Sequence, residues 1–335
     1  MEARIKHVGE NEEGIRRVRR GKGFQYFDAD GDKLNDPVLL ERFRQLAIPP
    51  NWKKVWICPH TDGHIQATGI DAKERKQYIY HEEWRKYRNT AKFYKLKEFA
   101  EWLPSIRKKA SADLKLQGWP KSKVLGLIIL TLDDVHIRIG NTFYRDTNDT
   151  FGLTTLRRRH LHIENRHLVF EYKAKSGKYR KVNIHNKKLS KLIKECSMLP
   201  GYEVFRYREN GLSLPITSAD VNDYLKEIST ENFSSKDFRT WGGTVLAVEK
   251  FPEAKRLSEE NKRIKLVPQV IKLVANELGN TQAICREYYI HPAILKTIEN
   301  GDYDRLTFEE EKTPDFELTS SEKKALEIIS EAEDK

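Results

Sequence analysis

The sequence predicts an α+β protein, with a small antiparallel β domain at the N-terminus and a larger, mainly helical domain after it. Residues 22–82 alternate short β-rich runs with turn signals, among them Asp30-Gly31 and Asp62-Gly63. Asp-Gly pairs between such runs favour hairpins. From Glu82 onward, charged residues recur at helical spacing with aromatic residues between them. A chain of 335 residues also exceeds what one hydrophobic core usually organises, so two domains are expected.

The charge distribution suggests a third segment. From Glu309 onward ten acidic residues face four basic ones, a net charge of −6, although the whole chain carries +11. Residues 1–308 therefore hold +17, and so basic a chain commonly binds a polyanion. We predict a β-rich domain over 1–88, a mainly helical domain over 89–308 and an acidic tail or helix over 309–335.

A three-stranded β meander is expected inside the helical domain. Residues 160–185 alternate apolar and polar side chains, with turn candidates at Glu164-Asn165 and Ser176-Gly177. Helices are predicted to follow over 218–228, 238–251, 266–279 and 292–301, the last two ended by glycine. Thr319 and Glu322 match a capping box that opens a final acidic helix.

The cysteines and the N-terminal residues indicate the compartment. Cys58, Cys196 and Cys285 lie far apart and form no Cys-x-x-Cys pair, which argues against a disulfide framework or a zinc ribbon. The N-terminus has no apolar signal region, and the longest apolar run, 124–130, is too short to span a bilayer. We expect a soluble, cytoplasmic protein in a reducing environment.

Metal and nucleotide chemistry find little support. The "DADGD" run at 28–32 lacks the glycine and glutamate positions of a calcium loop and is interpreted as a hairpin turn. His160 and His162 share a strand face without a second ligand pair, so a solvated face is favoured. Asp133 and Asp134 point about 100° apart on a helix and are interpreted as surface charge. The chain has no Walker loop, dinucleotide fingerprint or Gly-x-Ser-x-Gly motif.

The remaining candidate chemistry is cationic. A phosphodiester transfer without metal or ATP needs side chains that neutralise developing negative charge, and arginine stays protonated and binds two oxygens. Arg138 interrupts an apolar stretch that we expect to be helical, Arg239 precedes an aromatic and two glycines, and Lys175 lies beside a turn. Each alone is more often an ordinary surface charge in a basic protein.

Two adjacent tyrosines, Tyr288 and Tyr289, stand in "CREYYIHP" near the end of a helical run. Helical geometry places Tyr288 on the side of Ile284, which suits a core residue, and Tyr289 toward Cys285 and Arg286. Tyr289 also ends the run, where a side chain reaches outward more freely. Taken alone, either tyrosine is more often an ordinary packed aromatic.

Taken in order, these segments resemble the active-site series of the small type IB DNA topoisomerases of bacteria and poxviruses. The series consists of Arg138 in "HIRIGN", Lys175 in "KSGK", Arg239 in "KDFRTWGGT", Asn280 in "LGNT" and Tyr289 in "CREYYIHP". "LAIPPNWKKVWICP", "GHIQATGIDAKERKQYIYHEEW" and "FGLTTLRRRHL" are similar to the bacterial branch, so the resemblance covers roughly residues 14–300. It implies the catalytic-domain fold that these enzymes share with the tyrosine recombinases.

The resemblance also implies a reaction. Tyr289 would attack a DNA phosphodiester to give a 3′-phosphotyrosyl link, after which the strand rotates and is religated. Arg138 and Arg239 would bind the non-bridging oxygens, and Lys175 would protonate the 5′-oxygen. Asn280 occupies the place where many members carry histidine, so its role would be a hydrogen bond and not proton transfer. No cofactor is expected, and divalent cations would at most stimulate the reaction.

Further residues match DNA-contacting positions of the family. In the N-terminal domain these are Gln77, Tyr78 and Tyr80, and period 2 places both tyrosines on one strand face. In the second domain they are Tyr144 and Thr155. The implied partner is duplex DNA, enclosed by a monomeric clamp in the nucleoid. We also expect the acidic tail to fold back on the basic surface and compete weakly with DNA.

Two other functions fit parts of the sequence. Tyrosine recombinases use a related constellation, but they typically carry His-x-x-Arg, whereas this chain has Lys236 three residues before Arg239. Their N-terminal domain is helical, unlike the β-rich one predicted here. A non-catalytic DNA-binding protein would explain the charge, but not the ordered series that ends in Tyr289.

Overall fold

The computed structural model describes residues 5–9, 11–309 and 311–333. The chain divides into two compact units, residues 1–92 and 93–335, so the boundary falls four residues after the predicted one. The predicted α+β class is confirmed, with an antiparallel sheet in the first unit and mainly helices in the second. No helix among the described residues is long and apolar enough to cross a bilayer.

The first unit contains a five-stranded antiparallel sheet of strand order β2-β1-β3-β4-β5. Its elements are β1 (Ile15–Arg20), β2 (Gly23–Phe27), α1 (Pro37–Gln45), β3 (Lys53–Ile57), β4 (Ile65–Ile70) and β5 (Lys76–Tyr80). The core under the sheet is formed by Ile15, Phe43, Ile48, Val55, Ile57 and Ala67.

Two local features of this unit test the sequence interpretation. The 28–32 run is a tight turn, as predicted: Asp28 donates its backbone N–H to the carbonyl of Asp32, at 3.0 Å, and Gly31 takes φ +94°. Helix α1 was not predicted, although its start carries a clear signal. The Asp36 side chain caps Val38 N–H at 2.8 Å and Pro37 opens the first turn.

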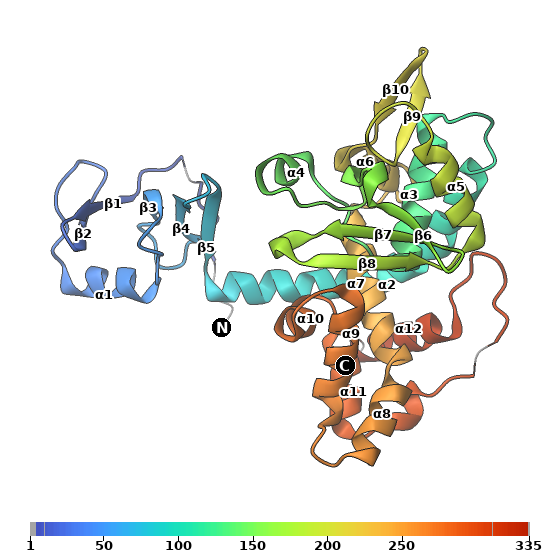
Figure 1. The fold of residues 1–335 in the computed structure, drawn as a ribbon. Helices are drawn as coiled ribbons and strands as arrows, with labels where there is room; N and C mark the ends of the chain where they lie inside the picture. Colours follow the sequence, from blue (N-terminus) through green and yellow to red (C-terminus); the bar gives the residue numbers. More distant parts are fainter. Residues whose placement is uncertain (1–4, 10, 310, 334–335) are drawn as a thin grey trace. The chain divides into compact units, whose positions relative to one another are not determined.

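The second unit is built around two buried helices (Figure 1). The apolar run of α3 is buried almost throughout, and α7 is buried from Phe238 to Val248. The helices are α2 (Glu82–Asp113, which begins in the first unit), α3 (Lys121–Val135), α4 (Thr142–Asn148), α5 (Lys187–Ser197), α6 (Ser218–Ser229), α7 (Ser235–Glu249), α8 (Phe251–Glu260), α9 (Leu266–Leu278), α10 (Gln282–Tyr288), α11 (Pro292–Asn300) and α12 (Ser320–Glu333), with 3-10 turns over Leu153–Thr155, Arg158–His160, Lys175–Gly177 and Tyr303–Leu306.

The predicted meander is confirmed as an antiparallel sheet of β6 (Leu161–Glu164), β7 (His167–Lys173) and β8 (Tyr179–Ile184). Its turns fall at the expected places, because Asn165, Ser176 and Gly177 all have positive φ. The predicted glycine stops are also confirmed: Gly279 ends α9 at φ +62° and Gly301 ends α11 at φ +83°. A hairpin of β9 (Arg206–Glu209) and β10 (Leu212–Pro215) was not predicted.

The acidic C-terminal segment is part of the second unit's core, which corrects the expectation that it folds over a basic surface. Helix α12 contacts α7 and α11 (Figure 1) and buries Ala325, Ile328 and Ile329. The predicted capping box is present, with Thr319 N–H donating to the Glu322 carboxylate at 2.9 Å. Most of its described acidic residues are exposed, but Glu322 is buried, so net charge alone misjudged this segment.

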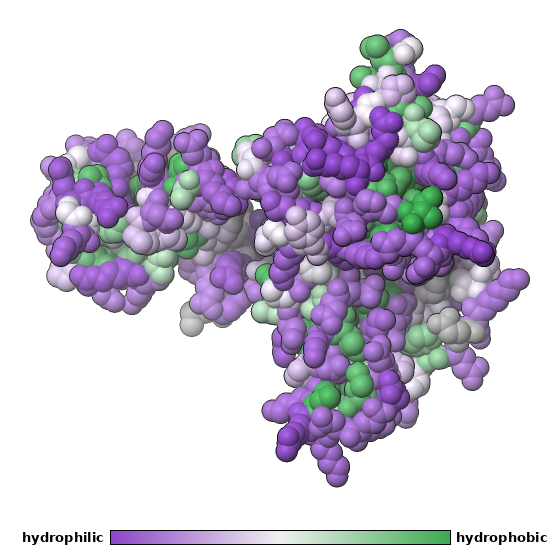
Figure 2. Space-filling model, in the orientation of Figure 1, coloured by the Kyte–Doolittle hydropathy of each residue, from purple (hydrophilic) through white to green (hydrophobic). Residues whose placement is uncertain are grey.

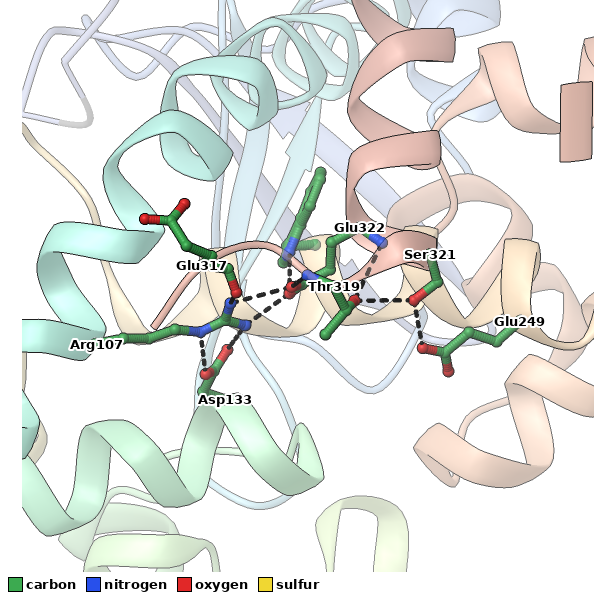
Figure 3. A network of polar contacts seen from close by, with 8 residues as sticks. Arg107, Asp133, Glu249, Glu317, Thr319, Ser321 and Glu322 are labelled. Carbon is green, nitrogen blue, oxygen red and sulfur yellow. Dashed lines mark hydrogen bonds and ion pairs between the residues drawn. The ribbon is translucent and has the colours of Figure 1, made fainter. Parts of the chain in front are cut away.

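A buried ionic network joins α12 to three other helices (Figure 3). Arg107 on α2 binds Asp133 on α3 at 2.7 Å and Glu322 on α12 at 2.6 Å. Glu322 also accepts the indole N–H of Trp241 on α7 at 3.2 Å. Asp133 is therefore a structural partner of Arg107 and not surface charge as predicted, whereas its neighbour Asp134 is exposed.

The pKa values of the two carboxylates of this network shift in opposite directions. Burial raises the pKa of Asp133 above its ordinary value, and Arg107 only partly opposes it. Burial would also raise the pKa of Glu322, but the hydrogen bond and charge of Arg107 outweigh it and lower that pKa. Arg107 thus supplies the positive charge that balances both carboxylates.

We expect Arg107→Ala to destabilise the second unit by about 3–5 kcal/mol, because it leaves buried carboxylates without a counter-charge. Urea unfolding followed by far-ultraviolet circular dichroism measures the change. The matched control is Arg256→Ala, which removes an exposed pair with Glu260 and should cost about 1 kcal/mol or less. Equal losses in both variants would contradict a special role for the network.

Candidate active site

Tyr289 lies in a short, tightly held junction between α10 and α11. It follows the last residue of α10 and donates its backbone N–H to the carbonyl of Cys285 at 3.0 Å. His291 then caps α11, its Nδ1 accepting the N–H of Ala293 at 3.1 Å. Both tyrosines are half-buried, and Tyr289 packs against the hydrophobic core, a role that the sequence assigned to Tyr288.

The "WGGT" run of α7 explains how this junction is held. A Cβ on Gly243 would lie 2.6 Å from the carbonyl oxygen of Tyr289, so only glycine permits this approach. Thr244 completes the contact: its hydroxyl lies 3.3 Å from the Tyr289 carbonyl and accepts the N–H of His291 at 3.0 Å. The backbone of Tyr289 is therefore fixed directly on helix α7.

Arg239 occupies the same helix and faces the Tyr289 ring. Its side chain is only 3% exposed, and its Cζ lies 5.0 Å from the ring centroid. It donates from Nη1 to the His136 carbonyl and from Nη2 to the Leu278 carbonyl at 3.0 Å. Burial, followed by the charge of Arg138, lowers the pKa of Arg239 to about 10, so it remains protonated at neutral pH.

Arg138 reaches the site from an extended segment, not from a helix as predicted. Helix α3 ends at Val135 because His136 adopts left-handed geometry, with φ +48°. Burial lowers the pKa of His136 to about 4, so its imidazole is neutral beside Arg239. Two residues later, Arg138 donates from Nη2 to the side-chain oxygen of Asn280. Gly242 allows this packing, since a Cβ there would meet the His136 ring.

Two buried donors at this site have no hydrogen-bond partner among the described residues. They are Nε of Arg239 and Nδ2 of Asn280. Buried donors without a partner are uncommon, and at a functional site they are available to a ligand oxygen. The arrangement therefore offers an anion two hydrogen-bond donors beside a phenol.

The phenol of Tyr289 is electrostatically activated. Burial alone would raise its pKa, but the charges of Arg239 and then Arg138 outweigh burial and hold the pKa below its ordinary value. Lys236, one turn before Arg239 on α7, acts in the same direction. A lowered pKa favours the phenolate, which is the nucleophilic form.

Arg180 on β8 is a residue that the sequence analysis missed. It donates from Nη1 to the Leu278 carbonyl at 2.5 Å and from Nη2 to the Glu277 carbonyl at 2.7 Å. The signal was present in the alternation of the strand. Val182 and Ile184 are buried, so period 2 turns Arg180 toward the interior as well.

Four of the five predicted site residues are brought together, and Lys175 is not. Arg138, Arg239, Asn280 and Tyr289 form the cluster described above. Lys175 is exposed on the turn between β7 and β8, and within the described residues no contact joins it to the other four. The turn itself is ordered by a hydrogen bond from Ala174 N–H to the Lys178 carbonyl at 2.7 Å.

The predicted DNA-contacting residues of the first unit lie on β5. Tyr78 and Tyr80 share a face, as predicted, with their rings stacked at 5.8 Å, and Tyr78 is 39% exposed. Gln77 is half-buried and donates to the Asp71 carboxylate at 2.9 Å. The stacked tyrosines therefore have accessible surface, whereas Gln77 is already engaged.

In the second unit, Tyr144 and Thr155 differ sharply. Tyr144 is 51% exposed on α4, beside the equally exposed Phe143. Thr155 is 2% exposed, and its hydroxyl donates to the Gly152 carbonyl at 3.0 Å. In contrast to the predicted DNA contact, this side chain is not accessible to DNA. His160 is also buried, at 7% exposure against the Phe151 ring, and does not lie on a solvated face.

Comparison with known proteins identifies the family. The model of the "Eukaryotic DNA topoisomerase I, catalytic core" matches residues 81–312, more than half of the chain. The chain belongs to the type IB DNA topoisomerases. The "Bacterial DNA topoisomerase IB, N-terminal domain" matches residues 23–71 in addition. The resemblance stated from the sequence is confirmed, and the topoisomerase is an isomerase that relaxes DNA.

Viral relatives of this topoisomerase cover most of its length. DNA topoisomerase 1B of Acanthamoeba polyphaga mimivirus is 28% identical over 297 residues, 86% of this chain and 88% of the relative. DNA topoisomerase 1B of vaccinia virus (strain Copenhagen) is 24% identical over 259 residues, 72% and 76% of the two chains. A solved structure of the XerH site-specific recombinase aligns at TM-score 0.36 and 17% identity over 70% of this chain and 58% of its own.

We expect Gly243→Val to slow DNA cleavage by this topoisomerase about 10²-fold, because the added side chain displaces the Tyr289 backbone. Single-turnover cleavage of a labelled duplex measures the rate. Gly23→Val is the control, since a Cβ at Gly23 meets nothing within 4 Å. A Gly243→Val protein with normal circular dichroism and a normal cleavage rate would show that the close approach is dispensable.

The lowered pKa of Tyr289 gives a second expectation. Arg138→Ala removes a positive charge near the phenol, so the pKa of Tyr289 should rise and phenolate should form only at higher pH. Titration of the phenolate absorbance, taken as the difference from a Tyr289→Phe background, isolates this group. Arg286→Ala, an exposed arginine paired with Glu299, is the control and should leave the midpoint unchanged. An unshifted midpoint in Arg138→Ala would refute the electrostatic explanation.

Proposed function

We propose that Tyr289 is the nucleophile with which this topoisomerase nicks one strand of duplex DNA. Its hydroxyl oxygen bonds to the phosphorus while the bond to the 5′-oxygen breaks, which gives a 3′-phosphotyrosyl link and a free 5′-hydroxyl. The strand end rotates about the intact strand, and the reverse reaction reseals it. The observation that carries the proposal is the position of Tyr289 beside Arg239. The centroid of the Tyr289 ring lies 5.0 Å from Cζ of Arg239, and the pKa of its phenol is lowered.

Arg239, Arg138 and Asn280 are proposed to bind the non-bridging phosphate oxygens. This assignment is supported by the two buried donors without partners, Arg239 Nε and Asn280 Nδ2. Within the described residues neither arginine forms an ion pair, so both charges remain for an anion. Donors fixed before the reaction stabilise the transition state without further reorganisation.

Lys175 is proposed as the general acid that protonates the 5′-oxygen. Its ammonium is exposed and makes no contact with the other site residues, so bound DNA must bring the leaving group to it. The phenol releases its proton to water, and Lys175 gives its own to the 5′-oxygen and regains one from water, so protons balance across the step. Because the covalent link conserves the energy of the broken bond, we propose that neither ATP nor a divalent cation is required.

Contacts to the duplex outside the site are proposed for Tyr78, Tyr80 and Tyr144. All three offer accessible aromatic surface in a strongly basic chain. Figure 2 shows that the visible face of each unit is largely hydrophilic, with small hydrophobic areas between. We further propose that the enzyme works as a monomer that encloses DNA, and that it acts on the nucleoid in the cytoplasm.

Relaxation of negatively supercoiled plasmid in EDTA without ATP tests the proposal. Wild type and Tyr288→Phe should yield relaxed topoisomers, whereas Tyr289→Phe should yield none, because it lacks the attacking oxygen. A recombinase would instead need paired sites and give exchanged products. Relaxation by Tyr289→Phe, or its absence in folded wild type over a range of salt, would overturn the assignment.

A further inference from the structure

The C-terminal end of α9 binds two arginines that come from different parts of the second unit. Arg180 on β8 donates to the carbonyls of Leu278 and Glu277, at 2.5 and 2.7 Å, and Arg239 on α7 donates to the same Leu278 oxygen at 3.0 Å. The last carbonyls of a helix have no donor within the helix and carry partial negative charge. Both guanidinium groups are therefore bound at the end of α9 by backbone carbonyls and not by a carboxylate.

The same helix end sets the position of Asn280. Gly279 turns the chain at φ +62°, and a Cβ there would lie 2.8 Å from Cδ of Arg180. Asn280 follows immediately and is fixed by its backbone N–H to the Ala275 carbonyl at 2.9 Å, and its side chain accepts from Arg138. Arg180 thus packs on the turn that presents Asn280 to Arg138.

We propose that Arg180 is a positioning residue for DNA cleavage: it fixes the end of α9, and through it the Arg239 and Asn280 groups that would bind the phosphate. The inference rests on the proposed function. Two of the five N–H donors of Arg180 bind these carbonyls, and we assign it no contact with the phosphate. It acts on the reaction through the residues that it holds.

Substitutions of Arg180 separate positioning from general support. Arg180→Ala removes two hydrogen bonds to the end of α9 and loosens the turn before Asn280, and misplacement by about 1 Å costs on the order of 10²-fold in rate. Arg180→Lys should restore part of the rate, since an ammonium can reach these carbonyls but lacks the planar fork. Lys181→Ala is the matched control: Lys181 is the next residue of β8, faces the opposite side and pairs with exposed Glu164.

The test is single-turnover cleavage and religation of a labelled duplex at saturating enzyme, with DNA affinity and thermal unfolding measured in parallel. Arg180→Ala should lower cleavage about 10- to 100-fold with affinity within about twofold of wild type. Arg180→Ala combined with Asn280→Ala should slow cleavage by less than the product of the two single effects, because part of the Arg180 effect passes through Asn280. A residue with a merely structural role would lower the unfolding temperature without this coupling.

Three results would overturn the inference: cleavage by Arg180→Ala at the wild-type rate, a loss confined to DNA affinity, or effects of Arg180→Ala and Asn280→Ala that multiply. Failure of the proposed function gives a different pattern. In that case the wild-type protein shows no cleavage that depends on Tyr289, and neither does any Arg180 variant.

Discussion

The site depends on arginines that are held by main-chain carbonyls. Arg239 is almost fully buried, yet its partners are the carbonyls of His136 and Leu278, and Arg180 shares the second of these. A carboxylate partner would neutralise each guanidinium and compete with a phosphate for its donors. Carbonyl dipoles fix the same geometry and leave the charge in place. The cost is expressed in the lowered pKa of Arg239, which results from burial first and then from repulsion by Arg138. The lowered pKa of Tyr289 follows from the same retained charge.

Helix α7 transmits this arrangement to the rest of the second unit. One face of the helix carries Arg239, Gly243 and Thr244 against the Tyr289 junction. On another face, Trp241 donates to Glu322 of the buried network. Glycines inside a helix lower its stability by roughly 0.5–1 kcal/mol each relative to alanine. Here that cost is offset by burial of the helix on several sides. The proposed active site and the core of the second unit therefore both depend on this fifteen-residue helix.

The sequence predicted the parts of the fold and site that local patterns encode. Period 2 located the β6–β8 meander, glycine stops located the ends of α9 and α11, and ordered motifs located Arg138, Arg239, Asn280 and Tyr289. The errors arose where a partner far away in the sequence decides the environment of a residue. Arg107 and Glu322 are 215 positions apart, so composition could not show that Asp133 pairs with Arg107 or that α12 belongs to the core. Thr155 is a different case, because its buried hydroxyl is bound within its own turn. Arg180 was recoverable from strand alternation and was overlooked.

The buried network of α12 has a consequence for the way the enzyme is made. Helix α12 is synthesised after every other described element, and domains fold as their segments leave the ribosome. A chain that stops before residue 320 contains all five proposed catalytic residues but lacks Glu322, so Arg107 and Trp241 lose their shared partner. Helix α7 would then carry Arg239 on an unsupported core. Arg239 is thus supported only once α12 is present, so the last described helix completes the core on which the site stands.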